Sequence, residues 1–188
     1  MKHTGSGWLK GRRFHSRLLL LTGLALLLAA VSCNDSLSPE DVVNLYLSEV
    51  NQGDRDDALQ RWETSEVGPS PVALDPEQER VRLEGRREVA EELTQALVVA
   101  GQRLRWERVG ASYYDLQDNI PSVREDPTDA DLATIEMRLI VEGREGASLE
   151  ESIAFNLWRV PEIGWHIMGL DKGLSVLEPF LNRLREMD

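Results

Sequence analysis

Residues 133–143, ATIEMRLIVEG, alternate between apolar and polar side chains, and this alternation decides the fold of the chain. Successive side chains of a β-strand point to opposite faces of a sheet, so a period of two predicts a strand with one buried face. The side chains expected on that face are Ile135, Met137, Leu139 and Val141. Residues 148–160, SLEESIAFNLWRV, follow after a short turn as a second alternating segment, with Leu149, Ile153, Phe155 and Leu157 on its apolar side. With residues 164–173, GWHIMGLDKG, they predict an antiparallel meander.

The segments before this meander have the spacing of helices. Residues 38–50, SPEDVVNLYLSEV, begin with Ser38 as an N-cap and Pro39 in the first turn, and Gly53 follows as a left-handed C-cap. Their apolar stripe is Val42, Val43, Tyr46, Leu47 and Val50. Asp54 is expected to cap a second short helix that carries Ala58, Leu59 and Trp62.

A third helix is expected to end at Gly101. Its apolar stripe is Val89, Ala90, Leu93, Ala96, Leu97 and Ala100. Asp75 and Pro76 open the charged segment before it. Whether the helix extends back through Gly85 stays open, because a glycine in the middle of a helix costs about 1 kcal/mol.

The remaining segments complete an α+β pattern. Residues 103–117, RLRWERVGASYYDLQ, read as a strand, and residues 119–132, NIPSVREDPTDADL, as an acidic loop broken by proline. The tail, residues 173–188, predicts an amphipathic helix that either packs back on the domain or binds a partner. Helices followed by antiparallel strands favour an α+β fold with N-terminal helices packed on one face of an antiparallel sheet.

The N-terminus has the pattern of an export signal. Five basic residues and no acid occupy the first 17 positions, and the uncharged run Leu18–Ser32 follows. That run has 15 residues, and a membrane-spanning helix needs roughly 20. It ends at Ala30-Val31-Ser32-Cys33, which resembles a bacterial lipobox, although leucine is more usual than alanine at the position of Ala30. An uncleaved signal anchor and an ordinary signal peptide are the alternatives.

The lipobox resemblance implies acylation of Cys33 with chains such as palmitate, and cleavage before it. The domain would then sit outside the cytoplasm in a bacterial cell envelope, anchored to a membrane through Cys33. Two or more acyl chains are needed for stable anchoring. The division expected is a signal peptide at 1–32, a polar spacer at 33–37, an α+β domain at 38–172 and the tail helix at 173–188.

Charge narrows the choice of partners. Residues 1–32 hold five of the 21 Lys and Arg and none of the 33 Asp and Glu, so the rest of the chain has a net charge of −17. Nucleic-acid binding rests on clusters of basic residues, so such a balance argues against it. Cys33 is the only cysteine, so the domain has no disulfide and no thiolate metal ligand. No cofactor signature is present in the sequence.

The order of elements carries a second resemblance. A capped helix, then NQGDRDDALQRW at 51–62, then strands closing on FNLWRVPEIGWHIMG at 155–169 resemble the NTF2-like superfamily over residues 38–170. This resemblance implies a curved sheet wrapped by helices around a cone-shaped cavity. Some such proteins are isomerases or dehydratases, and others bind or assemble. A cystatin-like sandwich is the alternative.

Candidate site residues follow from these expectations. A ligand pocket of apolar and aromatic walls would be lined by Tyr46, Trp62, Trp106 and Phe155, which are equally suited to a core. The weak candidates for an acid or base are Asp115, Glu151 and His166, each also an ordinary strand or surface residue. No metal site is expected from a single histidine in the domain.

The function expected is a non-enzymatic domain that binds a small apolar ligand or a protein partner. The alternatives are an NTF2-like isomerase or dehydratase, and a structural assembly module. Trp158 is the residue expected on the outer sheet face, where it would serve as a contact in a homodimer formed through the sheet.

Overall fold

The alternation at 133–143 does produce a strand, and it lies at the centre of the sheet. In a computed structural model the described residues are 37–62, 75–100, 103–117, 120–143, 148–161 and 163–186. Residues 36–188 form one compact unit that includes the C-terminal helix. The expected signal peptide, Cys33 and the spacer up to Ser36 lie outside the described residues.

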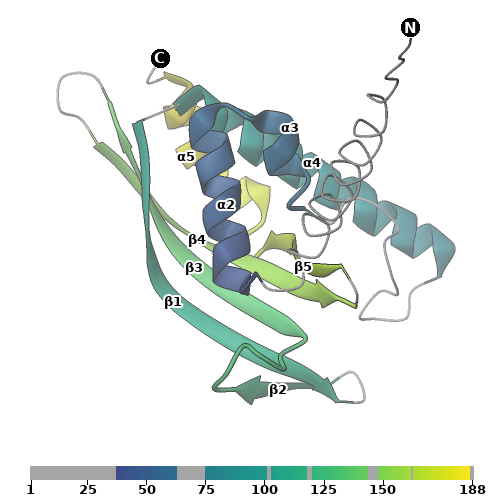
Figure 1. Ribbon diagram of the computed structural model, residues 1–188. Helices are drawn as coiled ribbons and strands as arrows, with labels where there is room; N and C mark the ends of the chain where they lie inside the picture. Colours follow the sequence, from purple (N-terminus) through teal and green to yellow (C-terminus); the bar gives the residue numbers. More distant parts are fainter. Residues whose placement is uncertain are drawn as a thin grey trace, which may run out of the picture. The chain divides into compact units, whose positions relative to one another are not determined.

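Five antiparallel strands form one open sheet. Their bounds are β1 Leu104–Gln117, β2 Ile120–Arg124, β3 Leu132–Glu142, β4 Ser148–Val160 and β5 Gly164–Leu170. The spatial order is β2-β1-β3-β4-β5, so the meander of β3, β4 and β5 is as predicted and β1 adds to its other side. Figure 1 shows the long strands curving around the helices. The α+β class with an antiparallel sheet is confirmed.

Strand β2 corrects the expectation of a loop at 119–132. Residues 120–124 pair with the end of β1, from Tyr113↔Arg124 to Gln117↔Ile120. Pro121 has no backbone N–H to donate. It is tolerated because β2 is an edge strand, which has a neighbouring strand on one side only. Only residues 125–131 keep the irregular conformation expected of the acidic segment, because Leu132 already begins β3.

Four helices are described: α2 Pro39–Gln52, α3 Arg55–Leu59, α4 Pro76–Ala100 and α5 Leu174–Glu186. Ser38 caps α2 in a reciprocal pair with Asp41, and Gly53 ends it in the left-handed conformation at φ 85°. Asp54 occupies the N-cap of α3 without a side-chain hydrogen bond. None of the described helices is both long and apolar enough to cross a membrane.

Helix α4 settles the question left open at Gly85. The helix runs without interruption for 25 residues, so the glycine is tolerated in its interior. Its start is fixed by Asp75, whose Oδ1 accepts from the backbone N–H groups of Glu77 and Gln78 at 3.0 and 2.9 Å. This side chain satisfies two N–H groups that have no partner within the helix.

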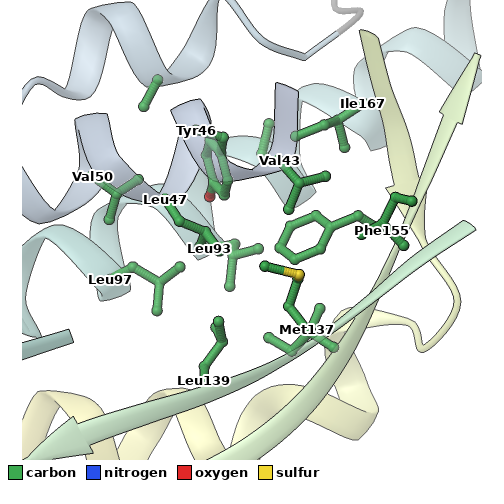
Figure 2. Close-up of a cluster of buried hydrophobic side chains, with 14 of the residues drawn as sticks. Val43, Tyr46, Leu47, Val50, Leu93, Leu97, Met137, Leu139, Phe155 and Ile167 are labelled. Atoms are coloured by element: carbon green, nitrogen blue, oxygen red, sulfur yellow. The ribbon is translucent and has the colours of Figure 1, made fainter. Parts of the chain in front are cut away.

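The core lies between the helices and one face of the sheet. We call this the inner face; it carries Ile135, Met137, Leu139 and Val141, all at most 1% exposed. Figure 2 shows α2 and α4 pressing Leu47, Leu93 and other apolar side chains against β3, β4 and β5. The apolar side of α5 is also buried, and the helix packs on α4 and β4. Of the two alternatives for the tail, the structure therefore has the packed one.

Trp62 differs from its expected place on a helix. Helix α3 ends at Leu59, and Trp62 forms an isolated parallel bridge with Ile167 of β5. The N–H of Ile167 donates to the carbonyl of Arg61 at 2.8 Å. The chain after α3 therefore covers the edge of β5.

Candidate functional site

The opposite side of the sheet, which we call the outer face, has a row of side chains that crosses every strand. Residues paired across antiparallel strands point to the same face. The registers Tyr114↔Val123, Tyr114↔Leu132, Leu132↔Trp158 and Trp158↔His166 therefore define a single row. Leu132 alternates with buried Ala133, which places the whole row on the outer face.

The outer face is divided into two chemically different halves. Toward the β3–β4 turn it carries the ion pairs Arg105–Glu142 and Arg138–Glu107. Toward β2 and the β4–β5 turn it carries the row just described, in which Val123 is 79% exposed and Trp158 only 5%. Polar residues cover one half of this face, and apolar residues gather in the other.

A pocket lies in the apolar half. Its volume is about 270 Å³, and its outward-facing wall residues come from all five strands. Those residues are Pro121, Tyr114, Leu132, Thr134, Asn156 and Met168, with Ala133 and Leu157 also in the lining. Small-molecule sites are usually 300–1,000 Å³, so this pocket suits a small ligand or one end of a larger one.

One polar pair interrupts the apolar walls. Thr134 and Asn156 lie opposite each other on β3 and β4, and the Thr134 hydroxyl donates to the amide oxygen of Asn156 at 2.9 Å. This bond leaves the amide nitrogen of Asn156 as a donor and the threonine oxygen as an acceptor. Among the described residues that line the pocket there is no Lys, Arg, Asp or Glu. The pocket therefore has the chemistry to hold a neutral, largely apolar molecule with one hydrogen-bonding group.

Three of the four residues expected to line a ligand pocket are packed together inside the core. The ring of Tyr46 meets the rings of Trp62 and Phe155 edge to face, with centroids 5.8 Å apart in each case. The three side chains are 0–2% exposed. A ligand at this position would have to displace one of the three rings. That these residues line a ligand pocket stays a prediction.

Polar contacts fix this cluster and the fourth residue. The Tyr46 hydroxyl lies 3.1 Å from the Thr94 hydroxyl, and burial raises the pKa of Tyr46, an effect that the hydrogen bond opposes. Trp106 is partly buried and packs against the core, and its Nε1 donates to the Asn44 side chain of α2 at 3.1 Å. These contacts hold α2 against α4 and β1.

The weak candidates for an acid or base have separate partners. Asp115 pairs with Arg124 of β2, and Glu151 accepts from the Lys172 ammonium at 3.2 Å. Nδ1 of His166 lies 3.2 Å from the carbonyl oxygen of Gly164. Burial lowers the pKa of His166, and the nearby charge of Arg61 lowers it further.

The strand register also keeps these candidates apart. Glu151 pairs with Leu139, whereas Asp115 follows Tyr114, the partner of Leu132. Seven residues of β3 separate the two positions, which corresponds to roughly 23 Å along the strand. His166 lies on the outer face of β5, and the alternation along β1 turns Asp115 to the opposite face from Tyr114. The three groups do not form one acid–base site.

Comparison with known proteins adds no family. No family model matches this chain, and neither a curated protein nor a solved structure matches it. Among the described residues, no group of three or more His, Cys, Asp or Glu side chains could hold a metal ion.

None of the outer-face pocket residues was singled out from the sequence. Thr134, Asn156 and Met168 occupy positions that the alternation assigns to the solvent side, and such positions receive no attention when a core is sought. Pro121 and Leu132 fall in the segment that was expected to be a loop. A signal was present: Leu132 and Trp158 are large apolar residues at outer positions of their strands. Trp158 was indeed expected on the outer face, where the register places it beside Leu132 and His166.

Proposed function

We propose that this chain is a lipid-anchored binding protein of a bacterial cell envelope. Acyl chains on Cys33 hold it to a membrane, and its domain, outside the cytoplasm, binds a small apolar ligand without changing it chemically. The anchoring half of the proposal rests on the lipobox resemblance at Ala30–Cys33 and on the acidity of the rest of the chain. An acidic domain has no electrostatic attraction to anionic lipid, so the acyl chains supply the attachment.

The observation that carries the binding half is the pocket on the outer sheet face. Its described walls are largely apolar, Thr134 and Asn156 form a polar pair among them, and none of the described lining residues is a carboxylate or a base. Apolar walls with few polar groups are the usual composition of small-molecule sites. Because the described part of the lining offers the Tyr114 phenol as its sole acid or base, it favours binding over proton transfer.

The finer assignment of the fold, an NTF2-like cone, belongs to the same proposal. It is supported by the order of elements, helices first and strands after, and by the curvature of the sheet around α2 (Figure 1). The alternative of an isomerase or dehydratase needs Asp115, Glu151 or His166 to meet in one cavity, and the strand register separates them. The alternative of a structural assembly module is an outcome of the experiment below.

Native mass spectrometry of the full-length protein, purified from the envelope of its own host, tests the proposal. A reproducible extra mass of small-molecule size is expected. The variant Thr134→Phe fills the pocket and should lose that mass. The matched control Ile140→Phe, on the outer face of the same strand but beyond the pocket, should keep it.

Two results would count against the proposal. A wild-type protein that is bare in every preparation would favour an assembly module. An extra mass that persists in a folded Thr134→Phe variant would place the ligand elsewhere, and the aromatic cluster of Tyr46, Trp62 and Phe155 would be examined next.

A further inference from the structure

The two edges of the sheet are treated differently by the chain. At the β5 edge, Arg61 and Trp62 cover Ile167 through a backbone hydrogen bond and a parallel bridge. At the other side, β2 pairs only with Tyr113–Gln117 of β1. Within the part of the chain that the structure describes, no strand lies beside Leu104–Ser112 on the side away from β3. Figure 1 shows this length of β1 forming the border of the sheet.

An unpaired strand edge presents backbone N–H and C=O groups to any chain that can add to it. This edge is also held firmly in its extended form. Trp106 donates to Asn44 of α2, and Arg108 makes an ion pair with Glu40 at the start of the same helix. The strand is therefore already in the conformation that a partner strand requires, so little ordering is left to oppose pairing.

The charges along this edge are exposed and alternate in sign. Arg105 and Glu107 point to the outer face, with side chains 71% and 55% exposed. On the β3 side they meet Glu142 and Arg138. Because both side chains are largely in solvent, they remain available to a strand that approaches from the open side.

We propose that this edge is a homodimer interface, in which β1 of two copies pair antiparallel about a two-fold axis at Trp106. In such a pairing, residues equally far from the axis face each other. Arg105 then lies opposite the partner's Glu107, and Glu107 lies opposite the partner's Arg105. Opposite charges directly across a strand pair stabilise it, whereas like charges destabilise it.

The neighbouring registers are disfavoured by the same rule. An axis at Arg105 places two arginines opposite each other, and an axis at Glu107 places two glutamates opposite each other. An in-register parallel pairing sets every charge against its own copy. Trp106 is therefore the axis that the charges of this segment select.

The bulge after Arg108 limits the length of the interface. The pairing with β3 shifts between Arg108 and Gly110, which leaves Val109 out of register. A bulge bends the strand and locally disrupts the ladder of hydrogen bonds, so a partner strand that pairs regularly with Leu104–Arg108 loses its register there. The regular two-fold pairing consequently runs from Leu104 to Arg108, and a dimer that closes on its own axis leaves this edge with no place for a third chain.

Charge exchange tests the interface in the full-length protein. Sedimentation velocity in detergent should show a concentration-dependent dimer for the wild type. Arg105→Glu alone and Glu107→Arg alone set like charges against each other across the axis, and each should weaken association about tenfold or more. The double variant carries both changes and restores the two opposite-charge pairs, so it should recover wild-type association.

The double variant also separates this proposal from a purely internal role of the charges. Its two changed residues still face like charges on Glu142 and Arg138 within the same chain, so a recovery cannot come from those ion pairs. A monomeric wild type, single variants that associate normally, or a double variant that stays as weak as the singles would each overturn the proposal. Circular dichroism establishes that every variant is folded.

A cross-linking experiment reads the register directly. Under oxidation, a mixture of the Arg105→Cys and Glu107→Cys proteins should form a disulfide-linked dimer faster than either protein alone, because only the mixture brings two thiols opposite each other. Equal rates for the mixture and for one of the single proteins would exclude the axis at Trp106. The outcome of this cross-linking experiment does not depend on whether the outer-face pocket binds a ligand.

Discussion

Glu49 of α2 accepts hydrogen bonds from Arg61 with both carboxylate oxygens, and this ion pair positions the segment that covers the β5 edge. Arg61 Nε lies 3.0 Å from one oxygen and 3.2 Å from the other. The two side chains are only 26% and 15% exposed, so water screens the pair less than it screens a surface pair. The hydrogen bond and the charge of Glu49 raise the pKa of Arg61, which stays charged.

Removing the ion pair between Glu49 and Arg61 should destabilise the fold. Glu49→Gln keeps the shape of the side chain but loses the charge, and a loss of about 1–2 kcal/mol in the free energy of unfolding is expected. The control Glu77→Gln breaks an exposed pair with Arg80 on α4 and should leave the free energy of unfolding nearly unchanged. Urea denaturation measures both, and equal losses would show that the Arg61 pair has no special weight.

Two glycines should respond to alanine with opposite signs. Gly85 lies within α4, and a Cβ there meets no atom within 4 Å, so Gly85→Ala should stabilise the protein by about 0.5–1 kcal/mol. Gly53 has φ 85°, and Gly53→Ala should destabilise by about 1–2 kcal/mol although its Cβ also has open space. Thermal unfolding should order the midpoints Gly85→Ala, wild type, Gly53→Ala; any other order contradicts the argument.

The lowered pKa of His166 predicts a pH dependence of stability. In the unfolded chain an imidazole titrates near pH 6.5, whereas in the folded protein burial delays its protonation to lower pH. Below about pH 6.5 the unfolded state therefore binds more protons, and the free energy of unfolding falls as the pH is lowered through that range. Above it, this contribution to stability is fully present.

The variant His166→Gln isolates this effect from the titration of carboxylates. As the pH falls from about 7.5 to about 5.5, the stability of the variant relative to wild type should rise, since only the wild type loses the histidine contribution. Chemical denaturation at several pH values gives the comparison. A difference that does not change with pH would mean that His166 titrates alike in both states.

Anchoring through Cys33 has a simple biochemical test. Cys33→Ser should leave a precursor that takes up no labelled palmitate and migrates above the processed form. The variant Ser36→Ala, three residues further on, is the control and should be acylated and processed normally. Labelled, processed Cys33→Ser protein would exclude the lipobox.

The sequence predicted the sheet well where one period dominates. The faces of β3 and β4 follow from their alternation because each strand has one side in the core and the other side toward solvent. Glu151 shows the limit of this reasoning, since it shares the inner parity opposite Leu139 yet lies at the border of the core, where it binds Lys172. Parity gives the direction of a side chain, and the surrounding elements decide whether it is buried.

The candidate site could not be predicted in this way. Its walls lie on five strands, and their proximity depends on registers that no local pattern contains. Strand β2 was predicted to be a loop because it contains Pro121. Proline is rare inside a sheet but is tolerated in an edge strand such as β2. Trp62 was assigned to a helix by its spacing from Ala58, whereas the chain turns after Leu59 to reach β5.

The bridge between Trp62 and Ile167 also bears on the timing of folding. Its two residues are about a hundred positions apart, and the apolar side of α2 has its sheet partners on strands made near the end of synthesis. Folds that depend on distant contacts close late and slowly. A chain of this design remains open while its first half emerges, and the export that we propose would need the chain to stay unfolded in this way until it has crossed a membrane.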